Sequence, residues 1–198
     1  LDGHTENPGD LSWAELEKLG NVTVYDFSEP AEAYARMIDA EIVLTNKTVI
    51  SREMIEQSTR LRMIGVLATG FNVVDIDAAA ERCIPVCNVP SYATEAVAQY
   101  TFALLLELCH RVGAHDRAVQ EGRWTQGKEF CFWDYPQIEL NGKTMGLIGY
   151  GRIGQAVGRI AAAFGMKVLH FSPSAREGGD SLEEVLRQSD VLSLHCPL

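Results

Sequence analysis

The sequence predicts an α/β fold with two doubly wound parallel sheets, of which the second is incomplete. Two patterns carry this prediction. Short apolar segments alternate with amphipathic segments in both halves of the chain, and a glycine-rich segment between an apolar strand and a helix begins the second set. With 198 residues, of which 46% are hydrophobic, the chain has enough apolar material for one good core or two small ones.

Composition argues against several classes of partner. A formal net charge of -10 and a pI near 4.9 argue against electrostatic binding to nucleic acid or to anionic membranes. The longest apolar run, around residues 101–106, is too short to span a bilayer, and no basic and apolar leader begins the chain, so we expect a cytoplasmic location. The five cysteines form no C-x-x-C pair, which predicts buried reduced thiols and no metal site.

In the first half, the pattern predicts strands at 21–27, 41–45, 61–68 and 84–89, and helices at 12–19, 28–40, 51–57 and 75–83. Two of the helix starts carry specific signals. Ser12 and Glu15 have the spacing of a capping box, while Ser28 is a possible N-cap with Pro30 in the first turn. Strands and helices that alternate at this spacing form a parallel sheet covered on both faces.

The middle of the chain has a different character. One long helix is expected from Thr94 to Gly122, with a bend near Gly113, because apolar positions recur at helical spacing and no proline interrupts them. Residues 123–143 contain Gly, Pro and several aromatic residues without a clear period. This predicts an irregular connection between domains whose aromatic side chains serve in packing.

After this connection the alternation restarts. Strands are expected at 143–149, 167–172 and 190–198, and helices at 152–164 and 181–188, the second with a capping box of Ser181 and Glu184. A doubly wound nucleotide-binding domain usually has about six strands, so three strands make half of one. We therefore expect the sequence to be a fragment of a longer protein.

Gly149, Gly151 and Gly154 have the spacing G-x-G-x-x-G within "GLIGYGRIGQAVG". A helix with small packing residues is the simpler explanation, but these glycines follow an apolar strand and open a helix in a strand-helix-strand unit of about 30 residues. Dinucleotide binding is therefore predicted: Gly149 permits a tight turn, Gly151 lets N–H groups approach a pyrophosphate, and Gly154 permits close helix-to-strand packing. The N–H groups of Arg152 and Ile153 would face the phosphates.

The end of the next strand bears on which dinucleotide is bound. A carboxylate that would hold a ribose 2'-hydroxyl is expected near residue 172, and this position is Ser172. Ser174 and Arg176 follow, and these groups are able to accommodate a 2'-phosphate, although Arg176 could equally be a solvated surface charge. NAD and NADP both stay open as the cofactor.

Three stretches together resemble one family: "LATGFNVVDIDAAAERCIPVCNVPSYATEAVAQYTFALLLEL", "ELNGKTMGLIGYGRIGQAVGRIAAAFGMKV" and "SDVLSLHCPL". They are similar to the D-isomer-specific 2-hydroxyacid dehydrogenases, and among these to the glycerate dehydrogenases or hydroxypyruvate reductases. The resemblance implies a flavodoxin-like substrate domain over 1–93, a long interdomain helix and connection over 94–140, and the first half of a Rossmann-like NAD(P)-binding domain over 141–198. It also implies a homodimer, a first strand just before residue 1 and further residues after 198.

The resemblance assigns roles to residues of this sequence. The loop "ATGFN" would hold the substrate carboxylate through main-chain N–H groups around Thr69 and Gly70, with Gly70 in an unusual backbone conformation and Asn72 as a polar group of the same loop. Thr69 also matches a position close to the cofactor. Cys196 and Pro197 of "HCPL" would line the adenine or ribose side of the cofactor.

The chemistry of the family needs an arginine that polarises the 2-oxo acid, a histidine that protonates it, and a glutamate that raises the pKa of that histidine. The resemblance puts all three after "HCPL", so no catalytic residue is expected within residues 1–198, and His195 is not taken for the proton donor. The implied function is that of an NAD(P)-dependent oxidoreductase that reduces a 2-oxo acid, hydroxypyruvate or glyoxylate, to the D-2-hydroxy acid.

Two alternatives stay open. The same architecture resembles the transcriptional corepressors called C-terminal binding proteins, and the chain would then belong to a non-catalytic NAD-sensing protein. A related dehydrogenase would instead act on phosphoglycerate, lactate, phosphite or formate.

Overall fold

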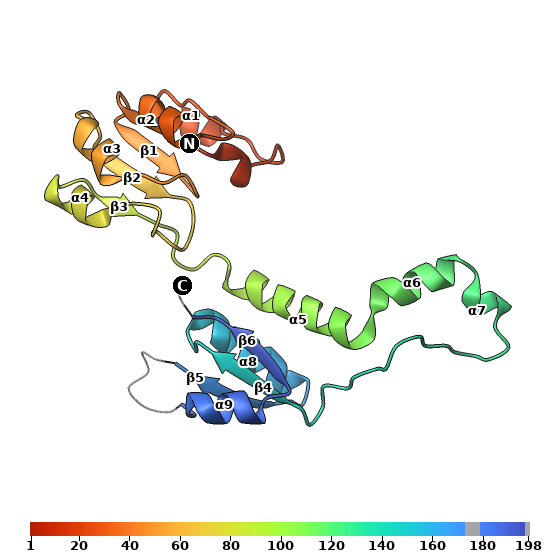
Figure 1. Cartoon of the computed structure of the whole chain (residues 1–198). Helices are drawn as coiled ribbons and strands as arrows, with labels where there is room; N and C mark the ends of the chain where they lie inside the picture. Colours follow the sequence, from red (N-terminus) through yellow and green to blue (C-terminus); the bar gives the residue numbers. More distant parts are fainter. Residues whose placement is uncertain (173–178, 197–198) are drawn as a thin grey trace. The chain divides into compact units, whose positions relative to one another are not determined.

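The computed structural model of the chain describes residues 1–172 and 179–196. Two compact units make up the chain, Leu1–Tyr92 and Ala93–Leu198, and each contains a three-stranded parallel sheet (Figure 1). The predicted α/β class with parallel sheets is confirmed. Within the described residues, no helix is long and apolar enough to cross a membrane.

The first unit begins with short elements and then alternates strands with helices. Its sheet has the order β1-β2-β3. The elements in chain order are η1 (Gly3–Thr5), α1 (Ala14–Glu17), α2 (Pro30–Met37), β1 (Ile42–Thr45), α3 (Arg52–Gln57), β2 (Met63–Val66), α4 (Ile76–Glu81) and β3 (Val86–Cys87).

The central strand β2 forms the middle of the first core. Its residues Ile64 and Val66 are buried, together with Met37 of α2 and Ile55 of α3. The helices α3 and α4 contact each other. Right-handed crossovers that step the same way across a sheet put their helices on one face, which accounts for this contact.

The second unit begins with a helical region and continues with a second sheet, of order β5-β4-β6 and parallel throughout. Its elements are α5 (Thr94–His110), α6 (Val112–Gln120), α7 (Arg123–Gln126), β4 (Thr144–Ile148), α8 (Arg152–Ala163), β5 (Lys167–Phe171), α9 (Leu182–Gln188) and β6 (Val191–Leu194).

The helices α8 and α9 cover opposite faces of the second sheet. Met145 and Leu147 of β4 are buried in one cluster with residues of α5 and α8. Gly146 points to the other face, where an added Cβ would collide with Ser189 at the end of α9. The second unit is therefore wound on both sides, and β4 is its central strand.

Residues 21–27, expected as a strand, do not form one. The carbonyls of Tyr25 and Asp26 accept hydrogen bonds from the N–H groups of Gly3 (2.8 Å) and His4 (3.3 Å). These donors belong to a 3-10 turn, which offers no strand ladder. Residues that favour strands stay irregular when no neighbouring strand pairs with them.

The cap predicted for the first helix is also wrong. The hydroxyl of Ser12 accepts from Ala14 N–H (3.2 Å), but α1 begins one residue later than the capping box requires. Glu15 instead pairs with Lys18 three residues on (2.5 Å). In this ion pair the Glu15 carboxylate contacts Lys18, whereas in a capping box it would accept a hydrogen bond from the N–H of the N-cap residue.

The other two caps differ in outcome. The capping box of α2 is formed by Glu29 and Glu32, one residue after the predicted Ser28, whose hydroxyl accepts from Arg36 instead (2.7 Å). The capping box of Ser181 and Glu184 at α9 is confirmed. A carboxylate is as good an acceptor as a hydroxyl for the first N–H groups of a helix, so sequence alone places such a cap only to within a residue.

The long helix expected over 94–122 is broken. Arg111, between α5 and α6, has φ 51° and ψ 45°, which is the left-handed conformation and ends the first helix. The break falls two residues before Gly113, where a bend was expected. After it the chain continues as α6 and α7.

The packing predicted for the aromatic side chains of residues 123–143 is found for some of them, such as Phe132 beside His115, but not for others. Phe130, Trp133 and Trp124 are 86%, 66% and 53% exposed. The prediction of buried thiols holds for Cys109 alone, since the other four cysteines are exposed.

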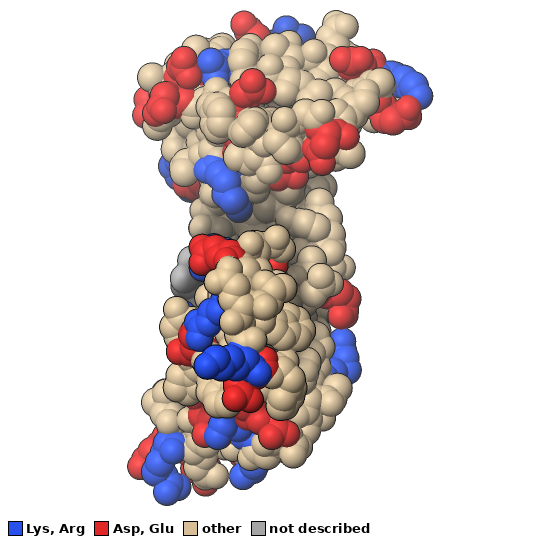
Figure 2. All heavy atoms as spheres, turned by 90° about the vertical axis from the view of Figure 1, so that its right-hand side faces the viewer, with Lys and Arg blue, Asp and Glu red and all other residues tan. Residues whose placement is uncertain are grey.

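Charged side chains are mixed on the surface. On the face drawn in Figure 2, Asp and Glu are interspersed with Lys and Arg. Arg52 of α3, for example, pairs with Glu81 of α4 (2.6 Å) and with Glu56 (3.5 Å). Exposed pairs of this kind contribute little to stability.

Candidate functional site

The glycine turn lies where β4 ends and α8 begins, at the carboxyl edge of the second sheet. Gly149 has φ +95°, a conformation that residues with a side chain rarely adopt. Its N–H donates to Phe171 O at the end of β5 (2.7 Å), and a Cβ here would lie 2.5 Å from the main-chain N of Cys196. The turn is thus held between the exits of the two neighbouring strands, with room for glycine alone.

Gly151 and Gly154 have different surroundings. Gly151 precedes α8 in an ordinary extended conformation, and a Cβ added to it would meet nothing within 4 Å in the part of the chain that the structure describes. A Cβ at Gly154 would collide with Gly149 O. Gly154 therefore lets the helix approach the turn closely, and Gly151 leaves open space at the start of the helix.

The start of α8 is suited to an anion. The first N–H groups of a helix have no acceptor within the helix and carry partial positive charge. In α8 they include those of Arg152 and Ile153, and the residue before them, Gly151, supplies no side-chain cap. The twelve-residue helix is fixed by its buried face, which includes Val157 and Ala161.

Tyr150, between the first two glycines, packs onto the protein. Its ring centroid lies 3.8 Å from that of His170 on β5, and its hydroxyl would lie 3.3 Å from a Cβ at Gly158 of α8. The ring therefore fills the space between β5 and α8, and the space beside Gly151 stays open.

The carboxyl end of β5 is followed by Ser172, which is partly exposed. Two hydrogen bonds join the strand to the point where the described chain resumes: His170 N–H donates to Asp180 Oδ2 (2.9 Å), and Asp180 N–H donates to His170 O (2.9 Å). Ser174 and Arg176 lie outside the described residues. Ser172 is thus the one residue, of the three predicted to influence the choice of dinucleotide, that lies among the described residues, and it comes directly after β5.

The carboxyl end of β6 meets the glycine turn. His195 N–H donates to Ile148 O (2.7 Å), and His195 Nε2 lies 2.9 Å from Ser193 Oγ. Burial lowers the pKa of His195, so its ring is neutral at pH 7. Cys196 is exposed beside Gly149, while Pro197 lies outside the described residues.

The predicted substrate loop lies at the carboxyl edge of the first sheet, directly after β2. Thr69, Gly70 and Asn72 are all exposed there. The expectation of an unusual backbone conformation at Gly70 is wrong, since its φ is not positive, and a Cβ would lie 3.3 Å from Asn72 Oδ1. The loop is held instead by its neighbours, beginning with a bond from Leu67 N–H to Thr45 O at the end of β1 (2.8 Å).

Two side chains that the sequence analysis missed hold this edge. Asn88, directly after β3, donates through Nδ2 to Thr69 O (2.8 Å). Asp2 is buried, and its carboxylate accepts from the N–H groups of Asn46 (2.9 Å) and Thr48 (2.9 Å) after β1, and also from that of Lys47. Asn88 was missed because the predicted strand covers 84–89, whereas β3 ends at Cys87. A polar residue near the end of a predicted parallel strand is the signal that could have found it.

The described residues contain no group of three or more His, Cys, Asp or Glu that could hold a metal ion. At each of the two sheet edges, the hydrogen-bonding groups include main-chain N–H groups together with hydroxyls or amides. These are suited to binding anions and sugar hydroxyls by hydrogen bonds.

The glycine turn has a counterpart in a known family of domains. Residues 102–198 match the NAD binding domain of the D-isomer specific 2-hydroxyacid dehydrogenases. The fold and the turn together therefore define the second unit as part of a nicotinamide dinucleotide-binding domain of the oxidoreductase class.

Individual relatives agree with this class. The chain is 52% identical over 208 residues to a hydroxypyruvate reductase from Blautia hydrogenotrophica, covering 100% of this chain and 65% of that protein. An acyclic imino acid reductase in complex with NADPH and D-Arg has a TM-score of 0.80 and 32% identity, over 95% of this chain and 62% of that one. D-Lactate dehydrogenase from Aquifex aeolicus, complexed with NAD and lactic acid, has a TM-score of 0.77 and 31% identity, over 94% and 57%.

The chain belongs to the D-isomer specific 2-hydroxyacid dehydrogenase family and is similar to its hydroxypyruvate reductases. It spans less than two thirds of the length of these three relatives.

Proposed function

We propose that the protein is a glycerate dehydrogenase, an NAD(P)-dependent enzyme that reduces hydroxypyruvate or glyoxylate to the D-2-hydroxy acid. The observation that carries this proposal is the 52% identity to a hydroxypyruvate reductase along the whole chain. The three relatives above are named as reductases or dehydrogenases, which favours the enzyme over a corepressor.

The cofactor would be held at the carboxyl edge of the second sheet. The open space at Gly151 and the N–H groups at the start of α8 fit a pyrophosphate. Bound there, the nicotinamide would supply the hydride that reduces the 2-oxo acid. The residues proposed to contact the cofactor are Thr69, Gly149, Gly151, Arg152, Ile153, Gly154, Ser172, Cys196 and Pro197.

The choice between NAD and NADP depends on the ribose. Ser172 can hydrogen-bond a 2'-hydroxyl but does not repel a 2'-phosphate, so we propose that both cofactors are used. Solved relatives are complexed with NADPH in one case and with NAD in another. Ser172→Asp should raise the preference for NADH at least 10-fold, measured as the ratio of kcat/KM with the two cofactors. The reverse change in this ratio would contradict the role of residue 172.

The substrate would be held by the first unit. The main-chain N–H groups of Thr69 and Gly70 would bind the carboxylate of the 2-oxo acid, with Asn72 beside them. The arginine, glutamate and histidine of the family would come from residues beyond 198. In this proposal residues 1–93 are the substrate domain, residues 94–140 the interdomain helix and connection, and residues 141–198 half of the cofactor domain.

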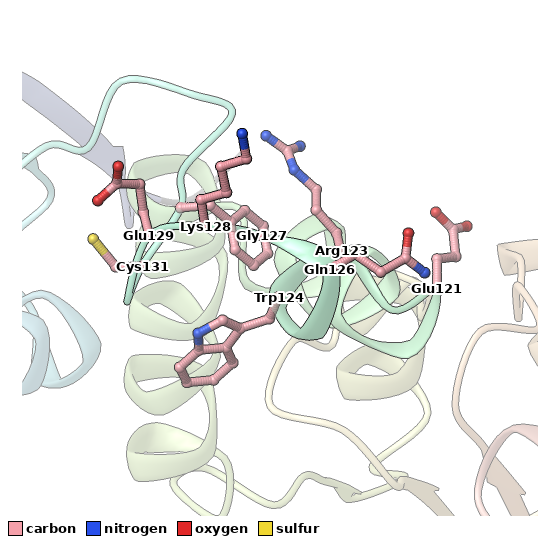
Figure 3. Close-up of a pocket in the computed structure, with 9 residues that line it drawn as sticks. Glu121, Arg123, Trp124, Gln126, Gly127, Lys128, Glu129 and Cys131 are labelled. Carbon is pink, nitrogen blue, oxygen red and sulfur yellow. The ribbon is translucent and has the colours of Figure 1, made fainter.

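We further propose that the protein is a homodimer, with the region of α6, α7 and the following segment in the contact. Its large aromatic side chains are exposed, and exposed apolar patches mark interaction surfaces. Around a cavity of about 520 Å³ in this region, Arg123 and Lys128 point to one side and Trp124 to the other (Figure 3). Phe130→Asp should give monomers in sedimentation analysis. The control Phe27→Asp, at an exposed phenylalanine of the first unit, should leave the dimer intact.

The main test is steady-state kinetics of the complete protein with a panel of 2-oxo acids, using NADH and NADPH separately. We expect the highest kcat/KM with hydroxypyruvate or glyoxylate, and a D-2-hydroxy acid as the product in chiral analysis of the hydroxypyruvate reaction. No turnover with any 2-oxo acid, combined with tight binding of NADH, would overturn the proposal in favour of a sensing protein. A clear preference for pyruvate or a phosphorylated substrate would show that the proposed substrate is wrong and that the proposed class of enzyme, an NAD(P)-dependent dehydrogenase, is right.

A further inference from the structure

The loop after β2 turns two consecutive carbonyls toward the same neighbouring segment. Ala68 O accepts from Val89 N–H (3.1 Å), and Thr69 O accepts from Asn88 Nδ2 (2.8 Å). Both donors belong to the residues that leave β3. In a regular strand consecutive carbonyls alternate in direction, so this loop has left the strand pattern.

The direction of the carbonyls fixes the direction of the N–H groups. No peptide bond of the described chain is cis, and in a trans peptide the C=O and the following N–H point in opposite directions. The N–H groups of Thr69 and Gly70 therefore both point away from the segment of Asn88 and Val89. Within the described part of the chain neither N–H donates a hydrogen bond.

Two successive N–H groups on one side of the chain form a concave site for an anion. A carboxylate has two acceptor oxygens, which suits a pair of donors, and the bonds to a charged acceptor are strong. The geometry of this site depends on the two peptide planes keeping their orientation. A peptide that is free to rotate would present one donor in place of two.

The two peptide planes are held in different ways. The peptide of Ala68 is held by a main-chain donor, which any residue but proline supplies at position 89. The peptide of Thr69 is held by a side chain, and few residues have a neutral amide donor at the length of Asn88. The orientation of Gly70 N–H thus depends on the identity of residue 88.

We propose that Asn88 is a positioning residue for the substrate: it fixes the Thr69–Gly70 peptide so that the Gly70 N–H meets the substrate carboxylate. The proposal rests on the proposed function, because it takes the loop after β2 as the carboxylate site. Asn88 itself does not touch the substrate. Its effect passes through one peptide plane.

The test uses the complete protein and three variants. Asn88→Ala removes the donor, and Asn88→Gln keeps an amide on a longer side chain. Asn21→Ala changes an exposed asparagine of the same unit whose side chain makes no hydrogen bond within the described residues. Two inhibition constants are measured for each variant. One is that of oxamate, a non-reacting analogue of a 2-oxo acid, with NADH present, and the other is that of ADP-ribose, which has the adenosine, pyrophosphate and ribose of the cofactor but lacks the nicotinamide and any 2-oxo acid group.

Asn88→Ala should raise the oxamate inhibition constant and the KM for hydroxypyruvate about 10-fold, the size expected for one hydrogen bond to a charged group. The ADP-ribose constant should change less than twofold. Asn88→Gln should recover part of the loss, and Asn21→Ala should match the wild type. Melting temperatures of all variants show whether the fold is intact.

The outcomes separate this proposal from the proposed function. Wild-type protein that reduces no 2-oxo acid overturns the proposed function and this proposal with it. An active wild type with an unchanged oxamate constant in Asn88→Ala overturns this proposal alone. An equal loss for oxamate and ADP-ribose also overturns it, because a general structural defect would weaken both.

Discussion

The carboxyl edges of the two sheets present main-chain N–H groups by opposite means. In the first unit, side chains hold the loops: Asp2 accepts from the loop after β1, and Asn88 donates to the loop after β2. In the second unit, the turn can form only because two of its residues have no side chain, since a Cβ at Gly149 or Gly154 would collide with the main chain. The first edge should therefore be sensitive to the removal of side chains and the second to their addition.

The largest effect is expected for Gly149→Ala. The new Cβ would lie 2.5 Å from Cys196 N in a backbone with φ +95°, so the free energy of unfolding should fall by about 2–5 kcal/mol. Urea unfolding of the complete protein measures this loss. The matched control is Gly142→Ala, where φ is +76° but nothing lies within 4 Å, and about 1–2 kcal/mol is expected. Equal losses at the two positions would show that the close contact is irrelevant.

The next effect is on binding instead of stability. Gly151→Val adds a side chain where an added Cβ would meet no atom of the described residues within 4 Å, so the melting temperature should stay within about 2 °C of the wild type. The dissociation constant of NADH, measured by fluorescence titration, should rise about 10- to 150-fold, because a charge-assisted hydrogen bond is worth about 1.5–3 kcal/mol. An unchanged dissociation constant for NADH would show that the pyrophosphate does not bind at this turn.

The first edge is tested by Asp2→Ala. Burial works to raise the pKa of Asp2, but the hydrogen bonds from Lys47, Asn46 and Thr48 outweigh it, and the pKa is lowered. The variant leaves these donors without their acceptor and should lose about 2 kcal/mol of unfolding free energy at pH 7.

This loss should depend on pH. Because the pKa of Asp2 is lowered in the folded state, its contribution is present above the unfolded-state value of about 3.9 and disappears as the pH falls through the lower folded-state value. Wild type and Asp2→Ala should therefore converge in stability at acid pH. An exposed carboxylate, Asp10, gives the control: Asp10→Ala should show neither the loss nor its pH dependence.

The smallest effect sharpens the comparison. Gly70 does not have a positive φ. The atom that would lie nearest to a Cβ added at Gly70 is Asn72 Oδ1, at 3.3 Å, and this side chain can move. Gly70→Ala should therefore change the unfolding free energy by less than about 0.5 kcal/mol. A loss as large as that of Gly149→Ala would mean that both edges depend on glycine.

The sequence predicted the elements that follow strong local patterns. The strands β2 and β4 are apolar because they are buried, and the turn with Gly149 is fixed by spacing that its context supports. The segment 21–27 has the composition of a strand and is not one, because pairing depends on a neighbour and composition does not record neighbours.

The candidate site could be predicted only in part for the same reason. The spacing of Gly149, Gly151 and Gly154 is local, so sequence reveals it. The hydrogen bond from Asn88 to Thr69 joins residues 19 positions apart, and neither residue type alone predicts it. The break at Arg111 is likewise invisible, because arginine does not favour the left-handed conformation that it adopts there.

The paired hydrogen bonds between His170 and Asp180 have a consequence for variation. They tie Asp180, which precedes the N-cap of α9, to the carboxyl end of β5. One bond uses the Asp180 carboxylate, whereas the other joins main-chain groups and is available to any residue except proline. A residue without a carboxylate at position 180 would therefore keep one of the two links between β5 and the start of α9 and lose the other.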